Sequence, residues 1–444
     1  MAKANTKFID KFVGDIKKDS GAIILTPKEM LEQQFGFPLK HFSQQYIFGA
    51  TGLRIGQWYS ISGPKESCKS SLLFDVMGHV CKYLGGIAVL IETEGKIAPD
   101  LLHGILQTRY GEDILGGQLQ VSRHKDKRTG STYPHTLKTA GDLLFDPKSG
   151  IIAKFSGVYD VPLLVGLDSI GGAADEATAK KIESDGAVGK QFADKQHHMK
   201  YLSENFSLLA SDTPIVVMTI NHESTRMGPT GISYKTITGG DAQQYKAGHM
   251  LSMAVRRTYQ SGGGKDLVLK TIKTSFCDAR KLDLSFRWNK FNNMEGHRFE
   301  WELASAVLLA DPDRGIGDLR DIVDVKVSDK GLVTCPQLNC TSVQPEEFEE
   351  QLMASDLLPQ LQTHMCISRI KGIEEYAEHM LRLQDPKAAK KAEEKAAKEP
   401  APAKKSRARK KKEEPEVQDQ EEQEPQEAPD GAFFEEEAQD GQQP

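Results

Sequence analysis

The residues best suited to chemistry lie in one short stretch of the chain. An apolar segment, Trp58 to Ile61, comes before it, and apolar residues at helical spacing follow it. A turn between a strand and a helix can hold a polyphosphate with its backbone N–H groups, while a lysine contacts the phosphates and a hydroxyl binds Mg²⁺. Lys69 and Ser70 fit the lysine and the hydroxyl. The stretch predicts a nucleotide site made of Gly63, Pro64, Lys65, Glu66, Ser67, Cys68, Lys69, Ser70 and Ser71.

The match to this phosphate-loop pattern is incomplete at Cys68, where a second glycine is expected. A Cβ atom there restricts the backbone and crowds the phosphates, so the pattern alone leaves both a phosphate loop and an unrelated turn open. Cys68 could also be a nucleophile. A neighbouring lysine lowers the pKa of a thiol only when it is not already committed to phosphate, which disfavours that alternative.

Polar residues follow three apolar runs, each of which is typical of a buried parallel strand. These are residues 86–91 before Glu92 and Glu94, 161–167 before Asp168, and 214–220 before Asn221 and His222. Ligands bind at the carboxyl ends of the strands in open α/β sheets. Asp168 is therefore predicted to hold Mg²⁺ beside the Ser70 hydroxyl.

The alternation of apolar strands and helices predicts an α/β fold with a mostly parallel, doubly wound sheet. The 444 residues divide by pattern into an N-terminal helical segment (1–40), an ATPase core (41–314), a small α+β domain (315–383) and a charged tail (384–444). Residues 171–189 and 223–240 depart from regular patterning after two of the strands. Long loops at a ligand-binding edge are usually functional.

The overall composition is that of a cytoplasmic protein that binds no membrane. Six scattered cysteines and no secretory signal predict reduced thiols, and no apolar run is long enough to span a bilayer. The formal net charge of −6 conceals an asymmetry in the tail. Residues 387–412 hold twelve Lys or Arg against three Glu, and residues 413–444 hold thirteen acidic residues and no basic ones. The tail is predicted to be disordered.

These motifs, taken in order, resemble the RecA recombinase family, and within it most closely the T-even-type phage recombinases (UvsX-like). The most specific stretch is Ile220-Asn221-His222, followed by a glycine-bearing loop and by Thr236-Ile237-Thr238-Gly239-Gly240-Asp241-Ala242. The resemblance covers about residues 20–290. It implies a RecA-like core whose N-terminal helix joins subunits into a helical filament.

Several roles are implied by the resemblance alone. Lys69 and Ser70 would bind ATP and Mg²⁺, Glu94 would orient the attacking water, and His222 would sense the γ-phosphate. Lys273 would reach nucleotide across the subunit interface, although Ser275 replaces a second such lysine. The family's two DNA-contacting loops correspond here to Lys200, Arg226, Met227, Lys235, Gly239 and Gly240. A solvated lysine and a buried strand-end histidine are the simpler interpretations of Lys200 and His222.

The resemblance implies an ATP-dependent recombinase that pairs single-stranded with double-stranded DNA and exchanges strands. Its expected partners are DNA, further copies of itself, a single-strand-binding protein and a loading mediator. Two alternatives share some of these features. A hexameric helicase is disfavoured by the Thr-Gly-Gly turn, and a mediator that does not hydrolyse ATP is disfavoured by the presence of Lys69, Ser70, Glu94 and Asp168 together.

Overall fold

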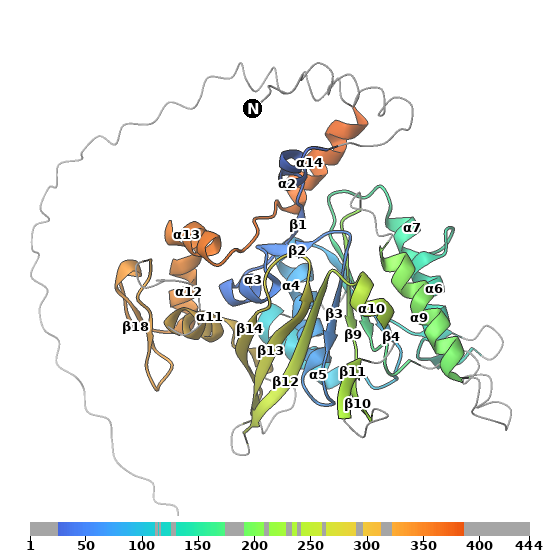
Figure 1. Cartoon of the computed structure of the whole chain (residues 1–444), viewed down its shortest axis with the longest axis horizontal. Coiled ribbons are helices and arrows are strands. Elements are labelled where there is room, and N and C mark those ends of the chain that lie inside the picture. The colour runs from blue at the N-terminus through green and yellow to red at the C-terminus, as the bar shows by residue number, and fades with distance from the viewer. Residues whose placement is uncertain are drawn as a thin grey trace, which may run out of the picture. The chain divides into compact units, whose positions relative to one another are not determined.

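The protein is described here from a computed structural model (Figure 1). The described residues are 25–111, 114, 117–125, 130–173, 191–207, 213–227, 233–237, 241–259, 263–289, 296–311 and 322–385. Residues 1–24 of the predicted N-terminal helical segment and nearly all of the charged tail lie outside them, so those predictions remain predictions.

A nine-stranded sheet forms the centre of the molecule, in the order β15-β14-β13-β12-β3-β9-β8-β4-β5. The six strands from β12 to β5 run parallel, and β13, β14 and β15 are antiparallel. The α/β class with a mostly parallel sheet is thus confirmed. The strands are β3 (Gln57–Ser62), β4 (Ile87–Glu92), β5 (Leu119–Ser122), β8 (Leu163–Asp168), β9 (Ile215–Ile220), β12 (His249–Thr258), β13 (Gly264–Thr274), β14 (Lys281–Arg287) and β15 (Arg298–Phe299).

Both faces of the sheet are covered, because successive side chains of a strand point to opposite sides. In β8, Leu164 packs in one hydrophobic cluster, while Val165 and Leu167 pack in the other. The first cluster includes side chains of α3 (Phe42–Phe48), α4 (Lys69–Leu84), α5 (Pro99–Tyr110) and α11 (Trp301–Ala310). The second includes side chains of α6 (Leu137–Phe145) and α9 (Gln191–Ser207), and α10 (Asp241–Lys246) packs against α9. Figure 1 shows α6, α7 (Ile151–Phe155) and α9 together at one side of the sheet.

Smaller elements connect these layers. They are α2 (Pro27–Glu32), β1 (Gly36–Pro38), β2 (Gly52–Arg54), β6 (His124–Lys125), β7 (Thr132–Tyr133), β10 (Glu223–Met227) and β11 (Ser233–Ile237). Part of the loop predicted at 223–240 is therefore an antiparallel hairpin, β10–β11. The segment was predicted as a loop because it is rich in Gly, Thr, Ser and Arg, although its β-branched residues favour strands.

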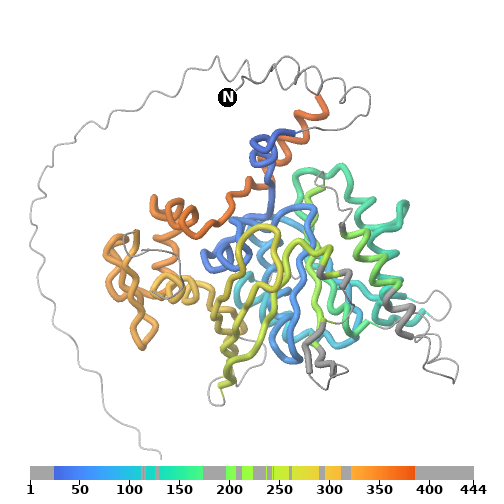
Figure 2. Tube along the Cα trace, in the orientation of Figure 1, coloured from blue at the N-terminus to red at the C-terminus, as the bar shows by residue number. Residues whose placement is uncertain are grey.

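The C-terminal part of the chain combines short strands and helices, as its mixed pattern predicted. It contains β16 (Lys326–Val327), β17 (Val333–Cys335), η3 (Pro336–Leu338), β18 (Cys340–Val343), α12 (Pro345–Met353), α13 (Leu357–His364) and α14 (Ile373–Gln384). Its Phe348 and Leu352 belong to the same hydrophobic cluster as α3 and α11. Near α14, Phe35 contacts Tyr376 edge-on, and Figure 2 shows α2 beside α14. The predicted domain boundaries remain predictions.

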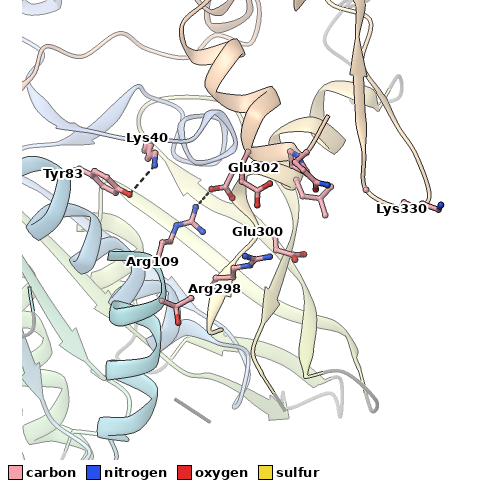
Figure 3. A pocket seen from close by; sticks show the side chains of 13 residues that line it. Lys40, Tyr83, Arg109, Arg298, Glu300, Glu302 and Lys330 are labelled. Carbon is pink, nitrogen blue, oxygen red and sulfur yellow. Dashed lines mark hydrogen bonds and ion pairs between the residues drawn. The ribbon is translucent and has the colours of Figure 1, made fainter. Parts of the chain in front are cut away.

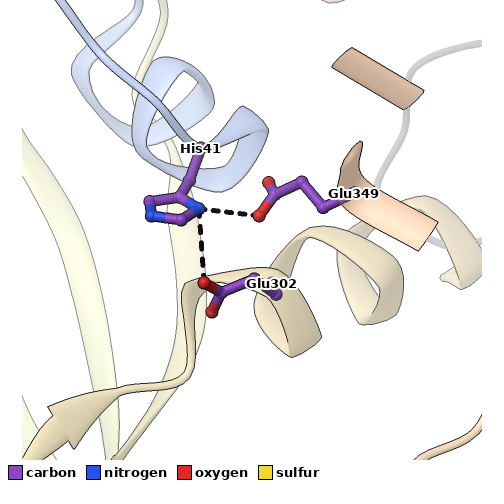
Figure 4. Close-up of side chains that lie close together, drawn as sticks. All are labelled: His41, Glu302 and Glu349. Atoms are coloured by element: carbon purple, nitrogen blue, oxygen red, sulfur yellow. Dashed lines mark hydrogen bonds and ion pairs between the residues drawn. The ribbon is translucent and has the colours of Figure 1, made fainter. Parts of the chain in front are cut away.

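A buried ionic network joins this C-terminal part to the core (Figure 4). His41 Nδ1 lies 2.7 Å from Glu349 Oε2 and 3.7 Å from Glu302 Oε1. Arg109 Nη2 donates to Glu302 at 2.6 Å and lies 2.8 Å from His41 Nε2. Glu349 also accepts the Phe42 N–H at 2.9 Å. These groups could ligate a metal by type and spacing, but the Arg109 guanidinium already supplies the cation that neutralises the carboxylates.

Replacing Glu349 with glutamine is expected to lower the free energy of unfolding by about 3 kcal/mol, because it breaks a buried pair and leaves partners unsatisfied. Burial raises the pKa of Glu349, but His41 and the hydrogen bonds outweigh it and hold that pKa below its ordinary value. The carboxylate therefore stabilises the fold above the ordinary pKa range of glutamate, and this stabilisation is lost as acid protonates it.

Denaturant unfolding followed by circular dichroism at neutral and acidic pH measures both effects. Glu350→Gln is the matched control, since Glu350 is the next residue of α12 and is exposed. Equal stability of the two variants at neutral pH would contradict a structural role for the network.

None of the helices in the described parts of the chain combines the length and apolarity that crossing a bilayer requires.

Candidate functional site

The predicted phosphate loop connects β3 to α4, as its strand and helix patterns predicted. Gly63 opens the loop with φ +156°, and a Cβ built there would lie 2.2 Å from the carbonyl oxygen of Met253 in β12. No other residue type fits this approach without displacing the backbone of β12. The loop thus passes against the middle of β12 and delivers Lys69 to the first position of α4.

Cys68 is the N-cap residue of α4 and has φ +61°, ψ +24°, in the left-handed region. This is the conformation that glycine adopts most easily, and a residue with a Cβ adopts it at a cost of about 1 kcal/mol. Cys68 therefore retains the backbone geometry of a glycine despite its side chain. The cysteine therefore strains the backbone at this position but does not change the conformation of the loop.

Lys69 is folded back into the loop and buried. Its Nζ donates to the carbonyl oxygen of Pro64 at 2.5 Å and to Ser67 Oγ at 3.2 Å. Burial lowers the pKa of Lys69, and the negative charges of Asp168 and Glu223 oppose that shift. A cation whose hydrogen bonds go to neutral oxygens suits the binding of a polyanion, because charged phosphates are stronger acceptors and would replace those oxygens.

Ser70 and Asp168 meet as predicted from the strand ends. Asp168 ends β8, and its carboxylate accepts a hydrogen bond from the Ser70 side chain. Burial raises the pKa of Asp168 to about 6, although the Ser70 hydrogen bond lowers it. A hydroxyl and a carboxylate are hard oxygen donors of the kind that Mg²⁺ prefers, so the residues present fit that ion.

Glu94 and His222 also meet at this edge, from the segments that follow β4 and β9. His222 Nε2 lies 2.8 Å from Glu94 Oε1, and Ser169 Oγ donates to the same oxygen. The hydrogen bond with His222 is the main cause that lowers the pKa of Glu94 to about 2. Glu94 is therefore a carboxylate throughout the neutral range. A Cβ added to Gly172 would lie 1.9 Å from Glu94 Oε1, so the segment after β8 packs directly on this carboxylate.

Two further polar residues of the site were not singled out from the sequence. Ser169 follows Asp168 and holds Glu94, and Glu223 follows His222 and lies against the phosphate loop, where its N–H donates to the Gly63 carbonyl at 3.1 Å. Each of them directly follows a predicted site residue, and this position in the sequence could have identified them as candidates.

The predicted DNA-contacting residues lie on separate elements. Lys200 is exposed on α9 and forms an ion pair of 3.8 Å with Glu204. Arg226 and Met227 lie in β10 and Lys235 in β11, with Arg226 opposite Tyr234 and Lys235 opposite Thr225. Gly239 and Gly240 lie outside the described residues. Their proposed roles remain predictions.

Lys273 lies near the end of β13, away from the residues that meet around Lys69. Its Nζ donates to the carbonyl oxygen of Tyr245 in α10 at 2.8 Å. Within the chain, Lys273 therefore contacts the end of a helix, and its predicted reach into a neighbouring subunit remains a prediction.

A cavity of about 380 Å³ is lined by none of the residues that meet at this edge (Figure 3). Lys40, Arg109, Arg298 and Lys330 line it with Glu300, Glu302 and Glu346. Arg109 is paired with Glu302, and Glu300 lies 3.2 Å from Arg287. Two of the three lining carboxylates are thus already paired and charges of both signs are present, so the cavity indicates no ligand class.

No protein-family model matches the chain, and no curated protein matches it significantly. The functional argument therefore rests on the residues that meet at the carboxyl edge of the sheet.

Alkylation tests the alternative role of Cys68 as a nucleophile. Burial raises the pKa of its thiol to about 11, against the lowering effects of Lys265 and Lys69. Only the thiolate reacts, so iodoacetamide near pH 8 is expected to modify Cys68 about 100-fold more slowly than an unshifted thiol. Peptide mapping by mass spectrometry measures the rate, with the exposed Cys366 as internal control. Equally fast labelling of both cysteines near pH 8 would support the nucleophile.

Proposed function

We propose that the chain is an ATP-dependent DNA recombinase. It forms filaments on single-stranded DNA and couples ATP hydrolysis to homologous pairing and strand exchange in recombination, repair and recombination-dependent replication. The observation that carries the proposal is the meeting of Lys69, Ser70, Asp168, Glu94 and His222 at one sheet edge. The hairpin β10–β11 begins directly after His222.

In the proposed reaction, Lys69 and the N–H groups of the loop and of the first turn of α4 bind the triphosphate. Ser70 and Asp168 hold Mg²⁺, which neutralises charge on the phosphates when bound. Glu94 accepts a hydrogen bond from the water that attacks the γ-phosphorus. The bond from that phosphorus to the bridging oxygen breaks, ADP keeps the electron pair, and the water's protons pass to phosphate and solvent.

The two carboxylate oxygens of Glu94 differ in their contacts. Oε1 is engaged by His222 and Ser169, so a water bound there must compete with both groups. Oε2 lies 3.5 Å from the Nζ of the exposed Lys96. His222 immediately precedes the hairpin that carries Arg226 and Lys235. A γ-phosphate that draws His222 away from Glu94 would therefore free the carboxylate and move the start of the hairpin together. Lys200, together with Arg226 and Lys235 of the hairpin, would then contact the DNA phosphates.

ATP turnover with and without single-stranded DNA tests the proposal, together with electron microscopy of the same mixtures and a strand-exchange assay with a homologous duplex. DNA-stimulated turnover, open filaments and exchanged strands are the expected results. Turnover with closed rings would instead indicate a hexameric helicase. DNA binding without turnover would indicate a mediator, and in that case the strained Cys68 is the first residue to replace with glycine.

The proposal extends to partners by the same reasoning. A filament on single-stranded DNA competes with any single-strand-binding protein for the same strand, and a loading mediator would resolve that competition. Subunits that add end to end form a heterologous contact that does not close.

A further inference from the structure

Glu92 is a buried carboxylate that the proposed reaction does not use. It ends β4, and its side chain is fully buried. Its Oε1 accepts the N–H of Ile97 at 3.0 Å, and its Oε2 accepts a hydrogen bond from Arg123 Nε. A buried carboxylate is costly unless it is paired and hydrogen-bonded, so these two contacts stabilise Glu92 inside the fold.

Arg123 reaches Glu92 because of the register of the sheet. β4 and β5 run parallel, and Ile91 lies opposite Ser122 at the end of their pairing. Glu92 and Arg123 are the next residues of the two segments, so they lie side by side at the carboxyl edge of the sheet. The Arg123 side chain remains 48% exposed. Arg123 therefore supplies its charge to a buried partner from the protein surface.

The contact between Glu92 and Ile97 closes a short loop that contains Glu94. At the beginning of this loop, Thr93 donates its hydroxyl to the Ser169 carbonyl at 2.6 Å. At the end of the loop, the Glu92 side chain holds the N–H of Ile97. The backbone on either side of Glu94 is thus attached to the carboxyl edge, and the second attachment depends on the Glu92 carboxylate.

We propose that Arg123 is a positioning residue, which neutralises Glu92 and thereby holds residues 93–97 in the conformation that places Glu94. The proposal rests on the proposed function, because it takes Glu94 as the group that orients the attacking water. When the guanidinium is removed, the Glu92 carboxylate loses its cation and is expected to turn toward solvent, which releases Ile97. Displacing a catalytic group by about 1 Å costs up to about 100-fold in rate.

Arg123→Met tests the proposal, since it removes the charge and keeps a long side chain. In DNA-stimulated ATP turnover, kcat is expected to fall about 10-fold or more, within the range for a misplaced catalytic group. The KM for ATP is expected to stay the same, because the substitution leaves the phosphate loop intact. Arg123→Lys keeps a cation and should recover part of the loss. Lys125→Met removes another exposed cation, two residues along the chain, and is the control.

A double substitution separates this role from a direct one. Glu92→Gln keeps an oxygen for the N–H of Ile97 but carries no charge, so it needs no cation beside it. In that background, Arg123→Met is expected to change kcat by less than about 2-fold. An Arg123 that contacted phosphate or water directly would lower kcat by the same factor in both backgrounds, and that result would overturn the proposal. A wild-type kcat in Arg123→Met would overturn it too.

Hydrogen exchange followed by mass spectrometry measures the loop without any turnover. Amides of residues 93–98 are expected to exchange about 10-fold faster in Arg123→Met than in the wild type, and at the wild-type rate in Lys125→Met. The double variant leaves no buried charge, so it is testable even where Arg123→Met folds poorly, and its amides should exchange as those of Glu92→Gln do.

The two measurements distinguish failure of the proposal from failure of the proposed function. A wild type that hydrolyses no ATP would refute the proposed function, while the exchange rates would still decide whether Arg123 holds the loop. Normal turnover in the wild type together with unchanged exchange in Arg123→Met would overturn the positioning role alone.

Discussion

Replacement of Lys69 by alanine is expected to weaken nucleotide binding and to reduce DNA-stimulated ATP turnover by about 100-fold or more, the loss usual for a charged group that stabilises a phosphoryl-transfer site. Lys69 is the buried cation of the loop, and in the proposed reaction it leaves the oxygens of Pro64 and Ser67 for the phosphates. Alanine offers no charge to the phosphates, while the backbone of α4 stays in place.

The fold is expected to tolerate this change. Burial lowers the pKa of Lys69, which means that the folded protein holds the ammonium at a cost in solvation. Removing it should leave the thermal midpoint unchanged or slightly raised, and a melting curve followed by circular dichroism checks that. Lys154→Ala, which removes an exposed lysine from α7, is the control for charge. Wild-type turnover in Lys69→Ala would mean that the loop does not bind the nucleotide that is hydrolysed.

Glu94→Gln is expected to reduce ATP hydrolysis by about 100-fold or more while nucleotide and DNA binding persist, the size of effect typical of losing the group that positions a reactant. Glutamine has nearly the same shape, but it is a far weaker acceptor for the attacking water than a carboxylate. Since the pKa of Glu94 is lowered to about 2, the wild-type residue is ionised across the neutral range. Titration of Glu94 therefore gives no loss of turnover between pH 5 and pH 8.

Single-turnover measurements separate nucleotide binding from hydrolysis. The variant should bind a fluorescent, slowly hydrolysed ATP analogue and form DNA complexes as the wild type does. With ATP, these DNA complexes should persist, because hydrolysis no longer releases the protein from DNA. Glu350→Gln again controls for charge. Full ATP turnover in Glu94→Gln would mean that another carboxylate of the site orients the attacking water. Glu92 is a poor candidate, because its side chain is committed to Arg123 and to the N–H of Ile97.

Much of the fold was predictable because its signals are local. Runs such as residues 163–167 are apolar at every position, which is typical of parallel strands covered on both faces, and the structure buries them on both faces. The polar residues after these runs had to meet at one edge, since parallel strands share their carboxyl ends. The meeting of Ser70 with Asp168 follows from that rule. The hairpin at 223–237 was missed because its glycines and short polar residues hide the strand pattern.

Sequence alone determined the identity and order of the groups at the sheet edge, because composition and period specify which residues end a buried strand. Only the tertiary structure decided what each group contacts. Ser169 and His222 share one oxygen of Glu94, and Glu223 turns back onto Ser252 and Ser62, although nothing in their spacing requires either arrangement. His41 meets Glu349 across 308 positions of the chain. Such contacts depend on how helices and strands pack, and packing is decided by the whole core rather than by any local pattern.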